Sequence, residues 1–192
     1  MAGRARAIRW VTRRWVVIRD VVQIQDETAR RQVQALMNRM LTAPKARGMD
    51  DLRILYLDGD DKAALTAWLR RHGEEQRKPG LVRDAANVDQ AVAVVVVGAR
   101  RLFMDLDCGM CGAPSCDEAR TGDLNCVYPL ADLGIAVGSG VSMAAEQGLD
   151  NRVMYSIGLA ALRTGLFGEP GIRCALGIPF SVSSKNVFFD RR

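Results

Sequence analysis

The segment AVAVVVVGA, residues 91–99, limits the possible folds of this chain more than any other feature of the sequence. A strand with one face in water alternates apolar and polar residues, whereas this segment is apolar at every position. We therefore interpret it as a central strand that is covered on both faces. Such a strand needs neighbouring strands and helices packed against the sheet.

Helical and strand-like patterns alternate on either side of this strand. Residues 26–41 place apolar side chains on one helix face, and Pro44 ends that helix because proline cannot continue it. A polar surface loop is predicted over residues 74–80. The other predicted helices cover residues 62–72, 130–148 and 151–166, and the other predicted strands cover residues 52–57, 172–179 and a short segment at the C-terminus. The predicted class is therefore α/β, or α+β, with a single central sheet packed by helices.

Three cysteines and two glycines lie close together in DLDCGMCGAPSC, residues 105–116, and a fourth cysteine follows at position 126. Four thiolates can bind either a tetrahedral zinc ion or a [4Fe–4S] cluster. Structural zinc sites usually pair two short ligand turns, and the second turn is missing here. Three ligands from one loop suit a cluster, so we predict a [4Fe–4S] cluster in the loop 105–128, with zinc or an unmetallated redox dithiol as alternatives. The predicted ligands are Cys108, Cys111, Cys116 and Cys126.

The residues around these cysteines support a metal or redox role. Gly109 and Gly112 each follow a cysteine, where glycine permits positive φ and lets backbone N–H groups point at sulfur. Cys174 lies in an apolar strand and is predicted to be a core residue. An odd number of cysteines without a secretory signal favours a reducing compartment, so we expect a cytoplasmic protein. His72 is the single histidine, which argues against a histidine-based metal site.

The formal net charge of +5 comes from the N-terminus alone. Residues 1–19 contain six arginines and no acidic residue, and the rest of the chain carries 21 basic against 22 acidic residues. Because the body is nearly neutral, no nucleic-acid partner is predicted. We interpret residues 1–16 as a basic extension, disordered or misannotated, and residues 17–192 as one domain. A transit peptide, or an interfacial helix using Trp10 and Trp15, is the alternative.

The longest apolar run, residues 133–145, is thirteen residues long. A membrane-spanning helix needs about 20 residues, so we predict a core helix and no transmembrane segment. Gly134, Gly138 and Ser142 recur every four residues within it. This small-residue stripe predicts close packing of another backbone, either in the core or across a dimer interface.

Several longer motifs carry a resemblance to a known family. They are TAPKARGMDD (42–51), VRDAANV (82–88), CGMCGAPSC with Cys126, DLGIAVGSGVSMAAEQGLDNRVMYSIG (132–158) and LGIPFSVSSKNVFFDR (176–191). Over residues 17–192 the chain resembles a family of bacterial and archaeal ferredoxin-domain proteins, which implies a cluster-binding protein. The cysteine loop is also similar to [4Fe–4S] modules of Rnf-type electron-transport and carbon-monoxide dehydrogenase/acetyl-CoA synthase subunits, although the fourth cysteine comes sooner here.

The scaffold also resembles flavin-binding nitroreductases, through the helix ending in A-P-x-A-x-G, the late small-residue helix and the strand ALGIP. That resemblance implies an α+β homodimer with FMN at the subunit interface. The nitroreductase arginine cluster that holds the FMN phosphate has no counterpart here beyond Arg30 and Arg31. Short polar and cationic loops offer other candidates for the phosphate. These candidates are Lys45, Arg47, Ser183, Ser184 and Lys185.

Together these observations predict an iron–sulfur redox protein that carries electrons one at a time to or from a redox partner protein. It is either a carrier or part of an iron–sulfur (flavo)oxidoreductase. The alternative is a structural adaptor that is braced by zinc or by a cluster and has no redox turnover.

Overall fold

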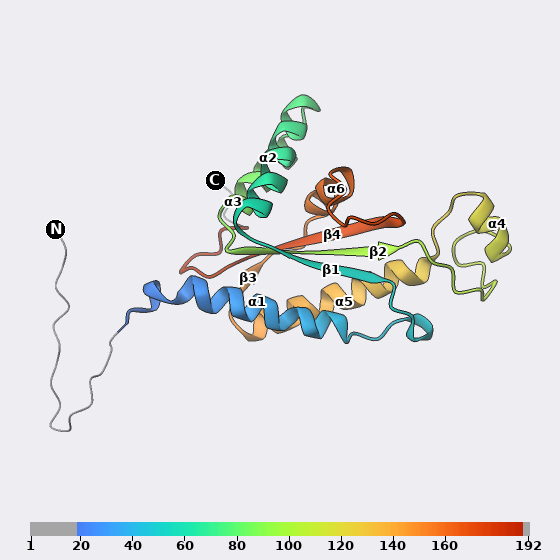
Figure 1. The fold of residues 1–192 in the computed structure, drawn as a ribbon, viewed down its shortest axis with the longest axis horizontal. Helices are drawn as coiled ribbons and strands as arrows, with labels where there is room; N and C mark the ends of the chain where they lie inside the picture. Colours follow the sequence, from blue (N-terminus) through green and yellow to red (C-terminus); the bar gives the residue numbers. More distant parts are fainter. Residues whose placement is uncertain (1–18, 190–192) are drawn as a thin grey trace, which may run out of the picture.

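The computed structural model describes residues 19–189, which form one four-stranded sheet (Figure 1). The strand order is β1-β2-β4-β3, and every neighbouring pair is antiparallel. The strands are β1 (Leu52–Leu57), β2 (Ala93–Arg100), β3 (Asp150–Asn151) and β4 (Ile172–Ser181). The predicted central strand is confirmed, because β2 lies between β1 and β4 and every residue of it except Arg100 is buried. The antiparallel pairing corresponds to α+β, the second of the two predicted classes.

Helices cover both faces of this sheet (Figure 1). On one face lie α1 (Gln25–Leu41) and α5 (Val127–Glu146), and on the other lie α2 (Gly59–Glu75), α3 (Pro79–Asp89) and α6 (Tyr155–Arg163). Alternate valines of β2 point to the two layers: Val95 and Val97 belong to the core under α1 and α5, and Val94 and Val96 to the core under the other three helices. The unbroken apolar run of β2 is thus explained by two cores that share one strand.

Helix α6 lies unusually close to β4. A Cβ atom added to Gly158 of α6 would lie 1.8 Å from the carbonyl oxygen of Ala175, and one added to Gly177 of β4 would lie 2.0 Å from Cγ2 of Ile157. These two glycines let the helix and strand backbones approach each other directly.

Three element predictions were wrong. Helix α2 runs to Glu75 and α3 begins at Pro79, so only residues 76–78 remain of the predicted loop; proline is well tolerated at the first position of a helix. The helix expected from residue 151 begins at Tyr155, because Asp150 and Asn151 pair with β4 as strand β3. The residues between β4 and Phe189 form bends and turns, not a strand.

Helix α5 has one buried and one exposed side. Within residues 19–189 it is the one helix that is long and apolar enough to cross a membrane by length and composition alone, with a mean hydropathy of 1.3. Its inner residues, including Leu133 and Ala136, pack in the core against α1 and the sheet, as predicted for a core helix. The small-residue stripe at Gly134, Gly138 and Ser142 is exposed, so it is not used for packing inside the chain.

The predicted extension, residues 1–16, lies outside the described residues. The assignment of residues 17–192 to a single domain remains a prediction, and its first two and last three residues also lie outside the described residues.

Candidate metal centre

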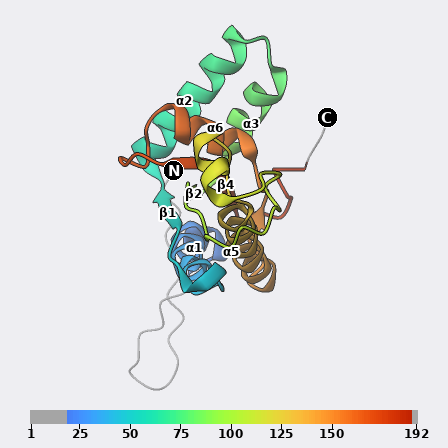
Figure 2. The ribbon, with the colours of Figure 1, turned by 90° about the vertical axis from the view of Figure 1, so that its right-hand side faces the viewer.

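The cysteine loop leaves the sheet at the end of β2 and projects from one end of the molecule (Figure 1; Figure 2 looks onto this end). It contains the short helix α4 (Cys116–Thr121) and leads directly into α5. At its start, the Arg101 N–H donates a hydrogen bond to the Gly171 carbonyl oxygen over 2.8 Å. At its end, Cys126 is the N-cap residue of α5. The loop is therefore anchored to the sheet at one end and to a core helix at the other.

All four predicted ligands line the same pocket in this loop. Cys108 is exposed, Cys111 and Cys116 are half-buried, and Cys126 is buried, so the pocket runs from the surface inward. The residues that line it are Phe103, Asp107, Cys108, Gly109, Cys111, Ala113, Ser115, Cys116, Cys126 and Val127. Four cysteines up to eighteen positions apart in sequence thus line one pocket, and their role as metal ligands stays a prediction.

The pocket offers four thiol donors, but their side chains are not arranged around a common point that a metal could occupy. Its cavity volume is about 10 Å³, roughly the space of one water molecule. Among residues 19–189, no three His, Cys, Asp or Glu side chains are arranged to hold a metal ion. All four cysteines are free thiols, and thiolates are the donors that iron–sulfur clusters and zinc both prefer. The chemistry of the donor set therefore fits such a group, with rearrangement of side chains on binding.

The backbone of the loop adopts left-handed conformations at several positions. Gly109 and Gly112 have φ values of 69° and 87°, as predicted for the glycines that follow cysteines. Asp105 and Asp107 also have positive φ, 52° and 45°, which is uncommon for residues with a side chain.

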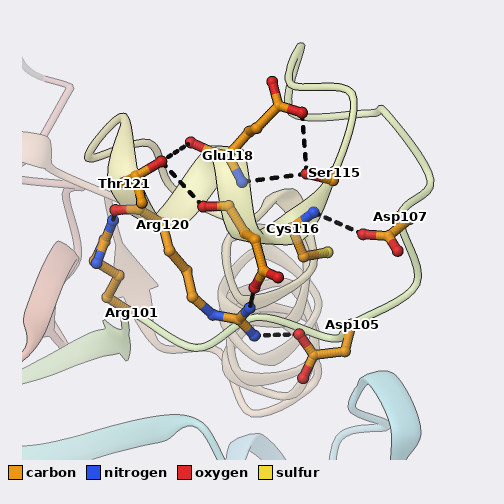
Figure 3. A network of polar contacts seen from close by, with 9 residues as sticks. Arg101, Asp105, Asp107, Ser115, Cys116, Glu118, Arg120 and Thr121 are labelled. Carbon is orange, nitrogen blue, oxygen red and sulfur yellow. Dashed lines mark hydrogen bonds and ion pairs between the residues drawn. The ribbon is translucent and has the colours of Figure 1, made fainter.

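Hydrogen bonds hold α4 against the start of the loop (Figure 3). The Cys116 N–H donates to Oδ1 of Asp107 over 2.7 Å. Ser115 caps α4, because its Oγ accepts a hydrogen bond from the Glu118 N–H over 3.2 Å. Asp107 and Ser115 both line the cysteine pocket, so these bonds fix part of its wall.

The first two residues proposed for a flavin phosphate, Lys45 and Arg47, follow the C-terminal end of α1. The Lys45 ammonium donates to the carbonyl oxygens of Leu41 and Ala43 over 2.6 and 3.1 Å. Arg47 has a φ of 54° and donates from Nη1 to the Met104 carbonyl oxygen over 2.7 Å, just before the cysteine loop. Both cations are thus engaged by the protein's own carbonyl groups.

The other proposed phosphate residues lie at the opposite end of α1. Ser183 lines an open cleft of about 640 Å³ together with Gln25 and Arg30, at the beginning of α1. Ser184 and Lys185 follow it in the same exposed turn, where the Lys185 N–H donates to Ser183 Oγ over 3.4 Å. Seventeen helical residues separate the two ends of α1, a length of about 25 Å. One chain therefore does not bring the two sets of candidates together.

Two buried carboxylates lie beside Lys45 and Ala46, after the C-terminal end of α1, and were not singled out from the sequence. Asp51 is fully buried, and neither of its carboxylate oxygens has a hydrogen-bond partner. Asp132 of α5 is 3% exposed and accepts a hydrogen bond from the Ala46 N–H over 2.9 Å. Burial, and next the nearby charge of Asp132, raise the pKa of Asp51 from its ordinary 3.8 to about 6. Asp50 and Asp51 stand side by side just before β1, and nothing in the sequence distinguishes the buried aspartate from the exposed one.

Comparisons with known proteins agree with the resemblance carried by the motifs. The family described as "Uncharacterized protein containing a ferredoxin domain (DUF2148)" matches residues 122–191. A protein of Archaeoglobus fulgidus, itself described as "Uncharacterized protein", is 35% identical over 159 residues, which cover 78% of this chain and 84% of the relative.

Solved structures share the fold. A putative nitroreductase in complex with FMN from Desulfovibrio desulfuricans aligns with a TM-score of 0.56 and 15% identity over 88% of this chain and 90% of its own. A nitroreductase with bound FMN from Desulfitobacterium hafniense aligns with a TM-score of 0.53 and 16% identity, over 81% of this chain and 78% of its own. B. megaterium NfrA2 aligns with a TM-score of 0.54 and 14% identity over 81% of this chain. The aligned part spans only 58% of the length of NfrA2. At such low identity these likenesses show a nitroreductase fold and nothing further.

Proposed function

The chain belongs to the ferredoxin-domain family, and on that premise we propose that it is a redox protein whose [4Fe–4S] cluster is held by its four loop cysteines. The observation that carries the proposal is the shared pocket, which Cys108, Cys111, Cys116 and Cys126 line together from two segments of the chain. A ferredoxin domain is the family's described property. When bound, such a cluster takes up and gives back one electron at a time.

The four cysteines differ in their exposure to solvent, from Cys126, which is buried, to Cys108, which is exposed. Cys126 is buried at the N-terminus of α5, where the helix dipole favours a negatively charged ligand. Phe103, Ala113 and Val127 form an apolar part of the wall and exclude water from it. Cys108 lies at the exposed edge, which is where a redox partner protein would approach. All five cysteines are free, which suits a reducing compartment, so we propose a cytoplasmic location.

We expect the wild-type protein, purified without oxygen, to contain about four iron and four sulfide per chain and to absorb broadly near ~400 nm. Cys116→Ala and Cys126→Ala should each lose most of the bound iron, because each removes one of four ligands. Cys174→Ala is the matched control: Cys174 lies in β4 outside the pocket, and burial raises the pKa of its thiol. Elemental and sulfide analysis of the four proteins makes the measurement.

A colourless wild-type protein with one zinc and no iron would contradict this function. It would instead establish the structural adaptor as the function of the loop. Equal loss of iron from Cys174→Ala would contradict the assignment of ligands.

A second candidate function, flavin binding by a homodimer, is favoured by the 640 Å³ cleft at the beginning of α1. Arg30 and Ser183 line this cleft, and cationic and hydroxyl groups suit a phosphate. Lys45 and Arg47, at the far end of α1, would join such a site from a second chain, because one chain keeps the two sets apart. The exposed small-residue stripe of α5 is available for contact between the two chains.

We expect FMN to bind to a dimer and Arg30→Gln to weaken its binding about tenfold, the effect of losing one charged hydrogen bond. Arg31→Gln is the control, because Arg31 pairs with Glu27 on the same helix and does not line the cleft. Equilibrium dialysis and sedimentation equilibrium give the two readouts. A monomer that binds no FMN would rule this candidate out.

A further inference from the structure

The segment that carries three of the cysteines is closed by one side chain, that of Arg120 in α4. Its guanidinium donates to Asp117 Oδ1 over 2.6 Å and also bonds Asp105 (Figure 3). Asp105 precedes Cys108 in the sequence, and Asp117 follows Cys116. The ion pairs of Arg120 therefore join the two ends of the stretch that contains Cys108, Cys111 and Cys116.

The same arginine packs against the wall of the pocket. Its guanidinium carbon lies 5.0 Å from the centroid of the Phe103 ring, and that of Arg101 lies 5.1 Å from it. Phe103 lines the cysteine pocket, whereas neither arginine does. The two positive charges are thus one aromatic ring away from the four thiols, at a distance typical of cation–π contacts.

Arg101 holds the backbone of α4 in place. Its side chain donates to the carbonyl oxygen of Arg120 over 3.0 Å and to that of Leu124 over 3.1 Å. Arg101 also anchors the loop to the sheet through its N–H, so the position of Arg120 is tied to the end of β2. Figure 3 shows the Arg101 side chain at the backbone of Arg120, whose own side chain extends to Asp105.

Arg120 stays positively charged, and it is the one basic residue in this acidic stretch of the chain. The hydrogen bond that Arg120 donates to Asp105 raises the pKa of Arg120 above its ordinary value, so the group stays charged throughout the usual pH range. Residues 102–130 contain five acidic residues and one basic residue, which is Arg120 itself. A group bound by four thiolates adds negative charge to this acidic end of the molecule, and net charge is one determinant of cluster potential.

We propose that Arg120 is a positioning residue of the cysteine pocket: it closes the loop around three of the ligands and places a positive charge behind Phe103 that favours the reduced state. This inference rests on the proposed cluster. Reduction adds one electron from an external one-electron donor and breaks no bond, so the site becomes more negative by one charge. A nearby cation stabilises that state more than the oxidised one.

The test compares three substitutions by redox titration of the cluster-loaded protein. Arg120→Gln removes the charge and the closing bonds, and we expect a threefold to tenfold smaller equilibrium constant for reduction, which is a shift of at most about 59 mV for one electron. Arg120→Lys keeps the charge and should keep the potential. Arg173→Gln is the control: it removes a cation that pairs with Asp123 at the same end of the molecule without contacting Phe103.

A second readout needs no cluster. In the metal-free protein, alkylation of Cys116 and Cys126 by iodoacetamide should be faster in Arg120→Gln than in wild type, because the loop is no longer closed. Arg120→Lys should show an intermediate rate and Arg173→Gln the wild-type rate.

Unchanged potential in Arg120→Gln, or an equal shift in Arg173→Gln, would overturn the electrostatic role. Unchanged alkylation in Arg120→Gln would overturn the closing role. If Arg120→Gln retains no iron, faster alkylation of its metal-free form supports the closing role and the wild-type rate overturns it. Absence of iron from the wild type would instead contradict the proposed function. The alkylation rates of the metal-free proteins would still decide whether Arg120 closes the loop.

Discussion

Replacing Gly158 by alanine is expected to destabilise the protein by about 3 kcal/mol or more, at or beyond the upper end of the usual range for overpacking. The added methyl carbon would lie 1.8 Å from the Ala175 oxygen and 2.3 Å from its carbonyl carbon. Both atoms belong to the backbone of β4, an inner strand of the sheet, so neither can rotate away. Helix α6 would have to move off the sheet and open the core that contains Ile157 and Ala160.

Urea unfolding followed by circular dichroism measures this effect. Gly80→Ala is the control, because Gly80 is exposed in α3 and an added Cβ meets nothing within 4 Å. That substitution should leave the free energy of unfolding unchanged or raise it by up to about 1 kcal/mol through helix propensity. A Gly158→Ala protein within about 1 kcal/mol of wild type would contradict the close approach of α6 and β4.

Replacing Asp51 by asparagine is expected to raise the free energy of unfolding at pH 7.5 by up to about 3 kcal/mol. The carboxylate is fully buried without a hydrogen-bond partner and lies near the charge of Asp132. The backbone N–H of Asp51 itself and then Lys45 lower the pKa of Asp51, and Asp50 raises it, but each of these effects is smaller than that of burial. An amide of the same shape removes the buried charge and offers N–H donors instead of a second carboxylate.

The pH dependence gives this prediction its sign. Because the folded pKa of about 6 is above the ordinary 3.8, the folded state binds more protons between these values, and stability falls as pH rises from about 4 to 6. The penalty is complete above pH 6, so Asp51→Asn should stabilise the protein at pH 7.5 and have little effect near pH 4. Asp50→Asn, at an exposed position, should change stability by less than about 0.5 kcal/mol. An Asp51→Asn protein less stable than wild type at pH 7.5 would refute the argument.

The parts of the fold that could be predicted are those where burial determines composition. The apolar run of β2 indicated a strand between two cores, and both cores are present. Strand direction was less accessible, because antiparallel pairing of β1, β2 and β4 depends on contacts between distant segments. The sequence does not predict helix α3, because a proline beside a glycine is typical of a loop, although proline at a first helical position is compatible with a helix.

Some residues of the candidate site could likewise be predicted from the sequence, and others could not. The four cysteines were identified from their spacing, and the structure places all of them around one pocket. The residues that shape the pocket were not identified, since Asp107 and Arg120 look like ordinary polar residues of a surface loop. Their roles arise from pairing across the loop, which local sequence does not reveal. Asp51 was missed for the same reason, because only tertiary packing buries it.

The cysteine loop buries side chains of its own, among them Met104, Ala119 and Cys126, outside the two core clusters. Among the described residues, neither core cluster includes a side chain between Arg100 and Asp132. We therefore expect the two layers of helices to stay folded when the loop holds no metal, unlike small zinc domains that unfold when metal is removed. If the loop holds a cluster, oxidative damage to that cluster leaves the sheet and both cores intact. On that expectation, a new cluster could assemble on the same folded chain without a new round of folding.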